Sequence, residues 1–61
     1  MPVVRVEWHE GHSSEDKKKV ANFIADTISQ ADKISKDRVM VMFTDYAGDS
    51  ISKGGKFSED K

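Results

Sequence analysis

Residues 3–9, VVRVEWH, alternate between apolar and polar side chains. The apolar positions share one face of an extended chain and are Val4, Val6 and Trp8. The polar positions share the other face and are Arg5, Glu7 and His9. A period of two residues is typical of a β-strand with one buried face, so we predict a strand over residues 3–9.

The period changes after this strand, and a helix is predicted over residues 14–31. Gly11 ends the strand, and Ser13 followed three residues later by Asp16 is similar to a capping box. The predicted buried face has apolar residues at helical spacing and comprises Val20, Ile24, Thr27, Ile28 and Ala31, flanked by Ala21 and Phe23. The lysines at positions 17–19 are interpreted as a solvated flank of this helix.

A second alternating segment, RVMVMFTD, predicts a strand over residues 38–45. One face of this strand carries Val39, Val41 and Phe43, and the other carries Arg38, Met40, Met42 and Thr44. The remaining residues predict a small hairpin, with an extended piece over residues 50–53 and a turn at Gly54-Gly55. The last four residues are expected to fray.

A strand, a long helix and a second strand predict an α/β (α+β) fold, a β-α-β unit in which the two strands are parallel. The short hairpin completes a single domain over residues 1–61. One helix covers only one face of a two-stranded sheet, yet Met40 and Met42 are apolar on the other face. We therefore expect other subunits to cover that face and to complete the sheet.

The composition argues against several classes of protein. Ten basic and eleven acidic residues give a formal net charge of −1, which argues against a nucleic-acid or membrane-surface partner. The sequence has no cysteine, so it offers no disulfide, no thiolate metal site and no cysteine nucleophile. No apolar run reaches the length of a membrane span, and the N-terminal residues lack a signal-peptide pattern. A cytoplasmic protein is expected.

His9, Glu10 and His12 raise the question of a metal site. Alternation along the strand sends His9 and Glu10 to opposite sides, and the spacing differs from that of two histidines on one face of a helix. No metal site and no cofactor are predicted, and the segment EGHS is interpreted as a turn from strand to helix. His9 is interpreted as a surface histidine, with the mouth of a pocket as the alternative.

Pro2 allows two interpretations. A proline at the start of a strand is tolerated because it donates no hydrogen bond to the sheet. Alternatively, removal of Met1 makes Pro2 the N-terminus, with a free secondary amine. An apolar pocket disfavours the charged form of such an amine, which can then act as a general base. The same nitrogen can also attack carbonyl groups.

The sequence as a whole resembles the 4-oxalocrotonate tautomerase family. The resemblance extends from Pro2 to about Gly55 and rests on the joint spacing of Pro2, Glu10, Gly11, Ser13, Lys17, Val39, Val41, Thr44 and Gly54-Gly55. It implies a β-α-β protomer, dimers with a four-stranded sheet, and a hexamer built as a trimer of dimers. It also implies that Pro2 moves a proton between oxygen and carbon and so interconverts the enol and keto forms of a 2-oxo acid.

Three positions that the resemblance assigns to substrate binding differ from the family pattern. His12 and Met40 stand where the family has arginines, and Ile51 stands where it has an aromatic residue. An arginine binds a carboxylate through two parallel hydrogen bonds, whereas a protonated histidine offers one and methionine none. Arg38 lies on the same predicted strand face as Met40 and is a candidate substitute, with an ion pair as the alternative. Lys53 is a second candidate cation, with solvent exposure as the alternative.

The function predicted from these residues is that of a tautomerase acting on a small monocarboxylate or neutral enol, with Pro2 as the general base. The loss of both arginines keeps an alternative open, a weakly active or inactive member that serves as an oligomeric scaffold or binding protein. A dehalogenase or hydratase that uses the same proline is a further alternative. Those reactions generally recruit extra acids and arginines, which we do not place in this sequence.

Overall fold

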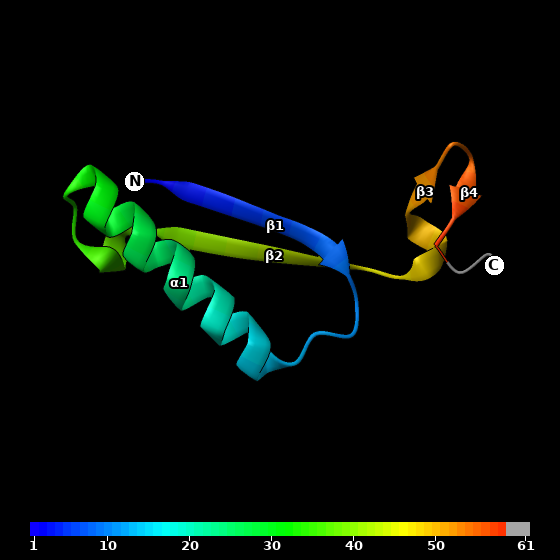
Figure 1. Cartoon of the computed structure of the whole chain (residues 1–61), viewed down its shortest axis with the longest axis horizontal. Coiled ribbons are helices and arrows are strands. Elements are labelled where there is room, and N and C mark those ends of the chain that lie inside the picture. Colours follow the sequence, from blue (N-terminus) through cyan, green and yellow to red (C-terminus); the bar gives the residue numbers. More distant parts are fainter. Residues whose placement is uncertain (59–61) are drawn as a thin grey trace.

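The structure, a computed structural model, describes residues 1–58 and has the predicted β-α-β order. Strand β1 (Val3–His9) pairs in parallel with strand β2 (Met40–Tyr46), and helix α1 (Ser14–Asp32) connects them. Figure 1 shows α1 along one side of the two strands, with the N-terminus at the edge where β1 begins. The predicted fold class, with its parallel pair of strands, is confirmed.

The two faces of the sheet differ in exposure, as the alternation predicts. The face toward α1 carries half-buried side chains, which are Val4, Val6, Trp8, Val41 and Phe43. On the opposite face Val3, Met40 and Met42 retain exposed fractions of 50%, 45% and 39%. Apolar side chains with this much exposure on one face favour its burial against another surface.

Helix α1 begins at its predicted capping residue. The backbone N–H of Asp16 donates to Ser13 Oγ over 3.0 Å, and Ser13 has extended backbone angles. The helix ends at Asp32, one residue beyond the prediction. It ends there because Lys33 adopts a left-handed conformation, with a φ of 54°, and its N–H returns to Ser29 O.

Ser13→Ala is expected to destabilise the protein by about 1 kcal/mol per protomer, because the N–H of Asp16 loses its acceptor. Urea denaturation followed by circular dichroism measures this change as a lower midpoint with an unchanged slope. Ser14→Ala is the control and should have a smaller effect, since the Ser14 hydroxyl makes no hydrogen bond within residues 1–58. Equal effects of the two substitutions would show that the cap does not stabilise the helix.

The buried face of α1 differs in part from the predicted one. Its buried and half-buried apolar residues are Val20, Ala21, Ile24, Ala25 and Ile28. The prediction places Phe23, Thr27 and Ala31 on or beside this face, whereas the structure exposes all three, Phe23 by 71%. The side of the helix that carries Ala21 and Ala25 is the covered one, and Phe23 lies outside it.

The second strand begins two residues later than predicted, which corrects the position of Arg38. Residues Lys36–Arg38 form the 3₁₀ turn η1 instead of extended chain. The N–H of Arg38 donates to Ser35 O over 3.0 Å, and the Ser35 hydroxyl bonds to the Asp37 carboxylate. These local hydrogen bonds compete with strand formation. Arg38 therefore does not share a strand face with Met40, and the prediction that it does is wrong.

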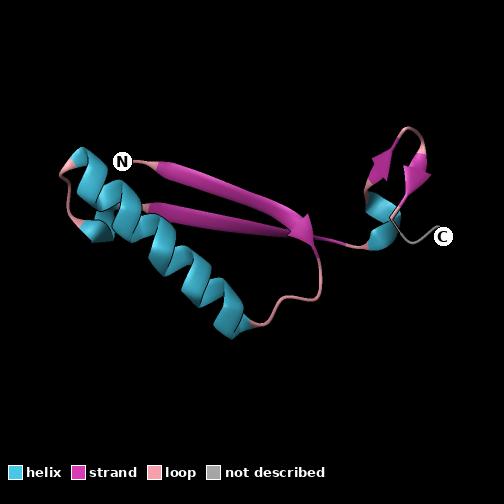
Figure 2. Ribbon diagram, in the orientation of Figure 1, coloured by secondary structure: helices cyan, strands magenta, loops and turns pink. Residues whose placement is uncertain are grey.

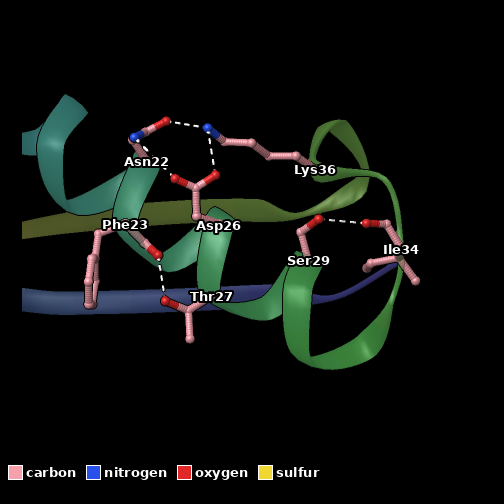
Figure 3. Close-up of polar contacts among 7 residues, drawn as sticks. All are labelled: Asn22, Phe23, Asp26, Thr27, Ser29, Ile34 and Lys36. Carbon is pink, nitrogen blue, oxygen red and sulfur yellow. Dashed lines mark hydrogen bonds and ion pairs between the residues drawn. The ribbon is translucent and has the colours of Figure 1, made fainter.

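Lys36 connects the η1 turn to helix α1 through a hydrogen bond and an ion pair. Figure 3 shows its ammonium group between Asn22 and Asp26, which are one helical turn apart on α1. The distance from Lys36 Nζ to Asp26 Oδ1 is 2.9 Å. Nearby, Ser29 Oγ donates to Ile34 O over 2.6 Å, and the N–H of Ile34 donates to Ser29 O over 3.2 Å. These bonds fix the end of α1 relative to the start of β2.

A short hairpin follows β2, as predicted. The 3₁₀ turn η2 (Gly48–Ser50) leads into strand β3 (Ser52–Lys53), which pairs in antiparallel fashion with strand β4 (Lys56–Phe57). Gly54 and Gly55 form the two-residue loop with φ angles of 63° and 81°, which glycine adopts without strain. Figures 1 and 2 show the hairpin beyond the far end of β2, away from α1.

The residue after the hairpin is bonded to both the hairpin and the sheet. The N–H of Ser58 donates to Ile51 O over 3.1 Å, and the Ser58 hydroxyl lies 2.5 Å from His9 Nε2. The predicted fraying of the last four residues therefore does not include Ser58. The rest of that prediction concerns residues 59–61, which lie outside the described residues.

A single protomer has an extended shape and little interior. Its radius of gyration is 14.6 Å, whereas about 10.5 Å is typical of a compact domain of this length. Its accessible surface of 4911 Å² exceeds that of a typical monomer of 6.8 kDa, about 4,000 Å². Among the described residues, Ala25 alone counts as buried, with 8% of its surface exposed. A protomer that buries so little apolar surface is marginally stable by itself.

Candidate active site

Pro2 and Met40 lie together at the edge where the two strands begin. The backbone N–H of Met40 donates to Pro2 O over 2.9 Å, and the half-buried Pro2 precedes Val3, the register partner of Met40. Arg38 lies at the same edge, in the turn before β2, and its side chain is exposed. Within residues 1–58 its guanidinium has no ion-pair partner. This edge therefore combines the candidate base with an available cation.

Ile51 lies at the opposite edge of the sheet, beside a hollow on the face away from α1. The hollow has a volume of about 520 Å³ and is lined by Glu7, Tyr46, Ser50, Ile51 and Ser52. The Tyr46 hydroxyl donates to Glu7 Oε1 over 2.6 Å. This hydrogen bond, with a smaller contribution from burial, raises the pKa of Tyr46 because a phenol bonded to a carboxylate resists ionisation. The lining of the hollow thus carries one carboxylate and no cation.

Lys53, the second candidate cation, is exposed on β3, where its register partner is Lys56. It follows Ser52 in the chain but does not line the hollow. The charge of the lining is therefore set by Glu7.

His12 lies at the same edge as Ile51 but on the side of α1, where it stacks on Trp8. The centroids of the two rings are 3.7 Å apart, and their planes differ by 18°. Trp8 Nε1 donates to Asp45 Oδ1 over 2.6 Å, and Lys17 Nζ lies 2.5 Å from Asp45 Oδ2. The bond from Lys17 and, next in size, the bond from Trp8 lower the pKa of Asp45. His12 thus lies on a network that joins β1, α1 and β2.

The candidate site residues are divided between the two edges of the sheet. Pro2, Met40 and Arg38 lie where the strands begin, whereas His12 and Ile51 follow the points where they end. Strand β1 has seven residues. At about 3.3 Å per residue, the two edges are about 20 Å apart. Figure 1 shows the same arrangement, with the N-terminus and the hairpin at opposite ends of the sheet. One protomer therefore does not bring these residues into a single pocket.

Comparison with known proteins identifies the family. The sequence matches the family described as Tautomerase enzyme over residues 2–61. The chain belongs to the tautomerase family. The match begins at Pro2 and extends over all of the candidate site residues, and the resemblance noted in the sequence is confirmed.

Solved structures share the fold of this tautomerase-family chain. A crystal structure of a 4-oxalocrotonate tautomerase homologue has a TM-score of 0.91 at 24% identity, covering 100% of this chain and 97% of the other. A heterohexamer 4-oxalocrotonate tautomerase from Chloroflexus aurantiacus has a TM-score of 0.89 at 20% identity, covering 98% and 97%. A structure analysed for trans-3-chloroacrylic acid dehalogenase activity has a TM-score of 0.80 at 16% identity, covering 92% and 97%. Among curated proteins there is no significant match. Proteins with this fold therefore have more than one activity, and the fold alone does not identify the reaction of this chain.

The two histidines of this tautomerase-family chain have separate surroundings. His9 Nε2 contacts Ser58 Oγ beside the hairpin, while His12 stacks on Trp8. Residues 1–58 contain no group of three side chains placed to hold a metal ion. In the same part of the chain, no helix is long and apolar enough to cross a membrane.

Two side-chain hydrogen bonds of the site were not predicted from the sequence. The first is the Trp8–Asp45 bond, for which the parallel register supplies a signal because these two residues are strand partners. The second is the Glu7–Tyr46 bond, which depends on Tyr46 continuing the second strand one residue past its predicted end. No sequence signal indicates the stacking of His12, because it depends on the path of the loop between β1 and α1.

Asp45→Asn is expected to flatten the fall in melting temperature at acidic pH. The pKa of Asp45 lies below its usual 3.8 because its ionised form is bonded by Lys17 and Trp8. A group whose pKa is lowered by folding stabilises the protein above its unfolded pKa, and this contribution is lost as the pH falls through the folded value. Melting temperatures measured by circular dichroism between about pH 5 and about pH 2 test this expectation. Lys17→Met should flatten the curve in part, since the bond from Trp8 remains, and curves parallel to the wild type for both variants would contradict the assignment.

Proposed function

We propose that this chain, after removal of Met1, is a tautomerase that interconverts the enol and keto forms of a small 2-oxo acid with a single carboxylate, and that Pro2 is its general base. The observation that carries the proposal is the position of Pro2, bonded to Met40 N–H at the start of β1 in a chain whose family match begins at that residue. The bond uses the carbonyl oxygen of Pro2, so a free amine is compatible with this geometry.

The reaction moves one proton from oxygen to carbon. The nitrogen of Pro2 accepts the proton of the enol hydroxyl on C2 of the substrate, and the electron pair of that oxygen forms the C2=O bond. The electron pair of the former C2=C3 bond then takes a proton at C3 from the protonated amine. The amine returns to its starting state, so this chain needs no cofactor and no net proton for the reaction.

The active site in this proposal forms between protomers of a homo-oligomer. One protomer supplies Pro2 and Met40, and another supplies Ile51, because the two edges of one protomer are about 20 Å apart. The exposed apolar face around Met42 and the hairpin that extends beyond the sheet both support association. A hexamer, built as a trimer of dimers, is the assembly that the family resemblance implies.

The charges at the two edges favour a substrate with one carboxylate. Arg38 supplies a permanent cation at the edge of Pro2, which can bind the carboxylate next to the enol. Met40 offers no hydrogen-bond donor from its side chain. At the other edge, the charge of Glu7 in the hollow beside Ile51 repels a second carboxylate. The uncharged end of the substrate is therefore expected in this hollow.

Two enol substrates test the proposal. The processed protein, with removal of Met1 confirmed by intact mass, is assayed on phenylenolpyruvate, which has one carboxylate, and on 2-hydroxymuconate, which has two. We expect turnover of both substrates, with the larger kcat/KM for phenylenolpyruvate. A folded, processed oligomer that turns over neither substrate would contradict the proposal. That result would favour the inactive scaffold, which the replacement of both arginines, at His12 and Met40, also favours.

Glu7→Gln is expected to raise kcat/KM for the dicarboxylate relative to phenylenolpyruvate by about three- to tenfold. The hollow keeps its volume and loses its negative charge, and the glutamine oxygen can still accept the bond from Tyr46. Phenylenolpyruvate is the internal control, because its far end carries no charge. An unchanged ratio of the two rates would show that Glu7 does not face the substrate.

A further inference from the structure

The C-terminal hairpin is too short to be rigid by itself. Strands β3 and β4 have two residues each, with Ser52 opposite Phe57 and Lys53 opposite Lys56. A two-stranded hairpin in water is marginally stable at best. Ile51, which lines the hollow, directly precedes this hairpin. The position of the Ile51 side chain therefore depends on how the hairpin is attached to the sheet.

Ser58 makes hydrogen bonds to the hairpin and to the sheet. Its backbone N–H donates to Ile51 O over 3.1 Å, which extends the hydrogen bonding of the hairpin by one residue pair. Its side-chain Oγ lies 2.5 Å from Nε2 of His9, a residue 49 positions away in the sequence. We call these two hydrogen bonds the hairpin junction. They connect Ile51 to His9, the last residue of β1, through Ser58 alone.

The hairpin junction lies on the side of the sheet that carries the hollow. Glu7 and His9 are two residues apart on β1, and side chains at this spacing point to the same face of a strand. Glu7 lines the hollow together with Ile51. His9 contacts Ser58 from that face, and Ser58 in turn bonds to the backbone of Ile51. The junction therefore fixes one side of the hollow relative to the strand that forms another.

The bond between His9 and Ser58 does not require a particular protonation state of the imidazole. A hydroxyl group both donates and accepts, so Ser58 Oγ can bond to Nε2 with or without its proton. The second bond of the junction joins two backbone groups, neither of which ionises. The geometric argument therefore holds for every form of the His9 ring.

We infer that Ser58 and His9 are positioning residues for Ile51, and that the hairpin junction holds the Ile51 side chain against the far end of the substrate. The inference rests on the proposed function, in which Ile51 of one protomer lies beside Pro2 of another. Pro2 makes its bond to Met40 N–H at the opposite edge of its own protomer, away from the junction. The junction therefore affects binding of the substrate and leaves the proton transfer unchanged.

Steady-state kinetics on phenylenolpyruvate separate substrate binding from proton transfer. Ser58→Ala removes the hydroxyl, and His9→Phe removes the ring nitrogen but keeps a ring. Each variant should raise KM by about three- to tenfold, as expected for the loss of one hydrogen bond, and should change kcat by less than about twofold. The double variant should behave like either single variant, because both remove the same bond. A lower kcat at unchanged KM, or effects that add in the double variant, would overturn the inference.

A conservative variant and a control separate the hydroxyl of Ser58 from a general effect of substitution. Ser58→Thr keeps a hydroxyl at the same position and should retain the KM of the wild type. Ser14→Ala removes a hydroxyl that makes no hydrogen bond within residues 1–58 and should leave KM and kcat unchanged. Sedimentation velocity should show the same assembly for all variants. The positioning role would be overturned if Ser58→Thr were as impaired as Ser58→Ala, or if Ser58→Ala dissociated.

Hydrogen exchange followed by NMR gives a readout that needs no turnover. In His9→Phe, the protection of the Ser58 N–H should fall by about three- to tenfold, because the hairpin opens more often. The protection of the Met40 N–H, at the other edge of the sheet, should not change. Equal protection of the Ser58 N–H in wild type and variant would overturn the junction.

The two measurements distinguish failure of this inference from failure of the proposed function. A processed wild type that turns over neither enol would overturn the proposed function and, with it, the substrate role of Ile51. Loss of protection in His9→Phe would then still support the attachment of the hairpin through Ser58. Normal turnover with an unchanged KM in Ser58→Ala would overturn the positioning role alone and leave Pro2 as the proposed base.

Discussion

Met42→Lys is expected to dissociate the proposed oligomer into protomers that are largely unfolded at micromolar concentration. Met42 lies on the sheet face away from α1, is 39% exposed in one protomer, and has Arg5 as its register partner. A lysine there adds a like charge beside Arg5 and an unpaired charge in the face that the proposed association buries. Burying such a charge costs roughly 3 kcal/mol or more. Since each 1.4 kcal/mol is about tenfold, the dissociation constant should rise by at least about 100-fold.

Sedimentation velocity and circular dichroism over a range of protein concentrations measure this effect. Phe23→Lys is a matched control, because Phe23 is an exposed apolar residue of α1, 71% accessible, and lies outside the half-buried side of the helix. The control should remain oligomeric. The interface assignment would be contradicted by a wild type that sediments as a stable folded monomer. It would also be contradicted if the control dissociated as readily as Met42→Lys.

Periodicity predicts the backbone of this protein well where burial on one face decides the structure. Residues 3–9 alternate throughout, and the observed strand has the same bounds. The start of α1 agrees because Ser13 caps it directly. Periodicity is less reliable where other interactions decide. Arg38 leaves the strand because Ser35 and Asp37 form a hydrogen-bonded turn. Phe23 is exposed because the sheet contacts only one side of the helix.

The candidate site is less accessible to sequence reasoning than the fold. A free terminal proline suggests a general base from chemistry alone, but the interpretation of His12, Met40 and Ile51 depends on the family pattern. The separation of the two edges follows from parallel strands, because a residue before the first strand and a residue after the second lie at opposite ends. The contact between His12 and Trp8 does not follow from any pattern, since the loop that carries His12 has no periodic constraint.

Retention of Met1 is expected to lower kcat/KM on phenylenolpyruvate by at least about 100-fold, the contribution typical of a general base. An acylated Pro2 nitrogen is an amide without a basic lone pair, so it cannot accept the proton of the enol. The fold should be unaffected, because the bond from Met40 N–H to the carbonyl oxygen of Pro2 is present with Met1 attached. A synthetic chain with Met1 and one without it, both checked by intact mass and by sedimentation, provide the comparison.

Pro2→Ala in the processed chain distinguishes loss of the base from a change in its properties. Alanine leaves a primary amine in nearly the same place, and its carbonyl can still accept the bond from Met40 N–H, so activity should fall by less than in the chain that keeps Met1. The rate of the processed wild type should rise with pH as the amine loses its proton, because only the neutral amine can act as the base. The chain that keeps Met1 should lack this rise. Equal rates for the processed chain and the chain with Met1 would rule out Pro2 as the base, because an amide nitrogen cannot perform that step.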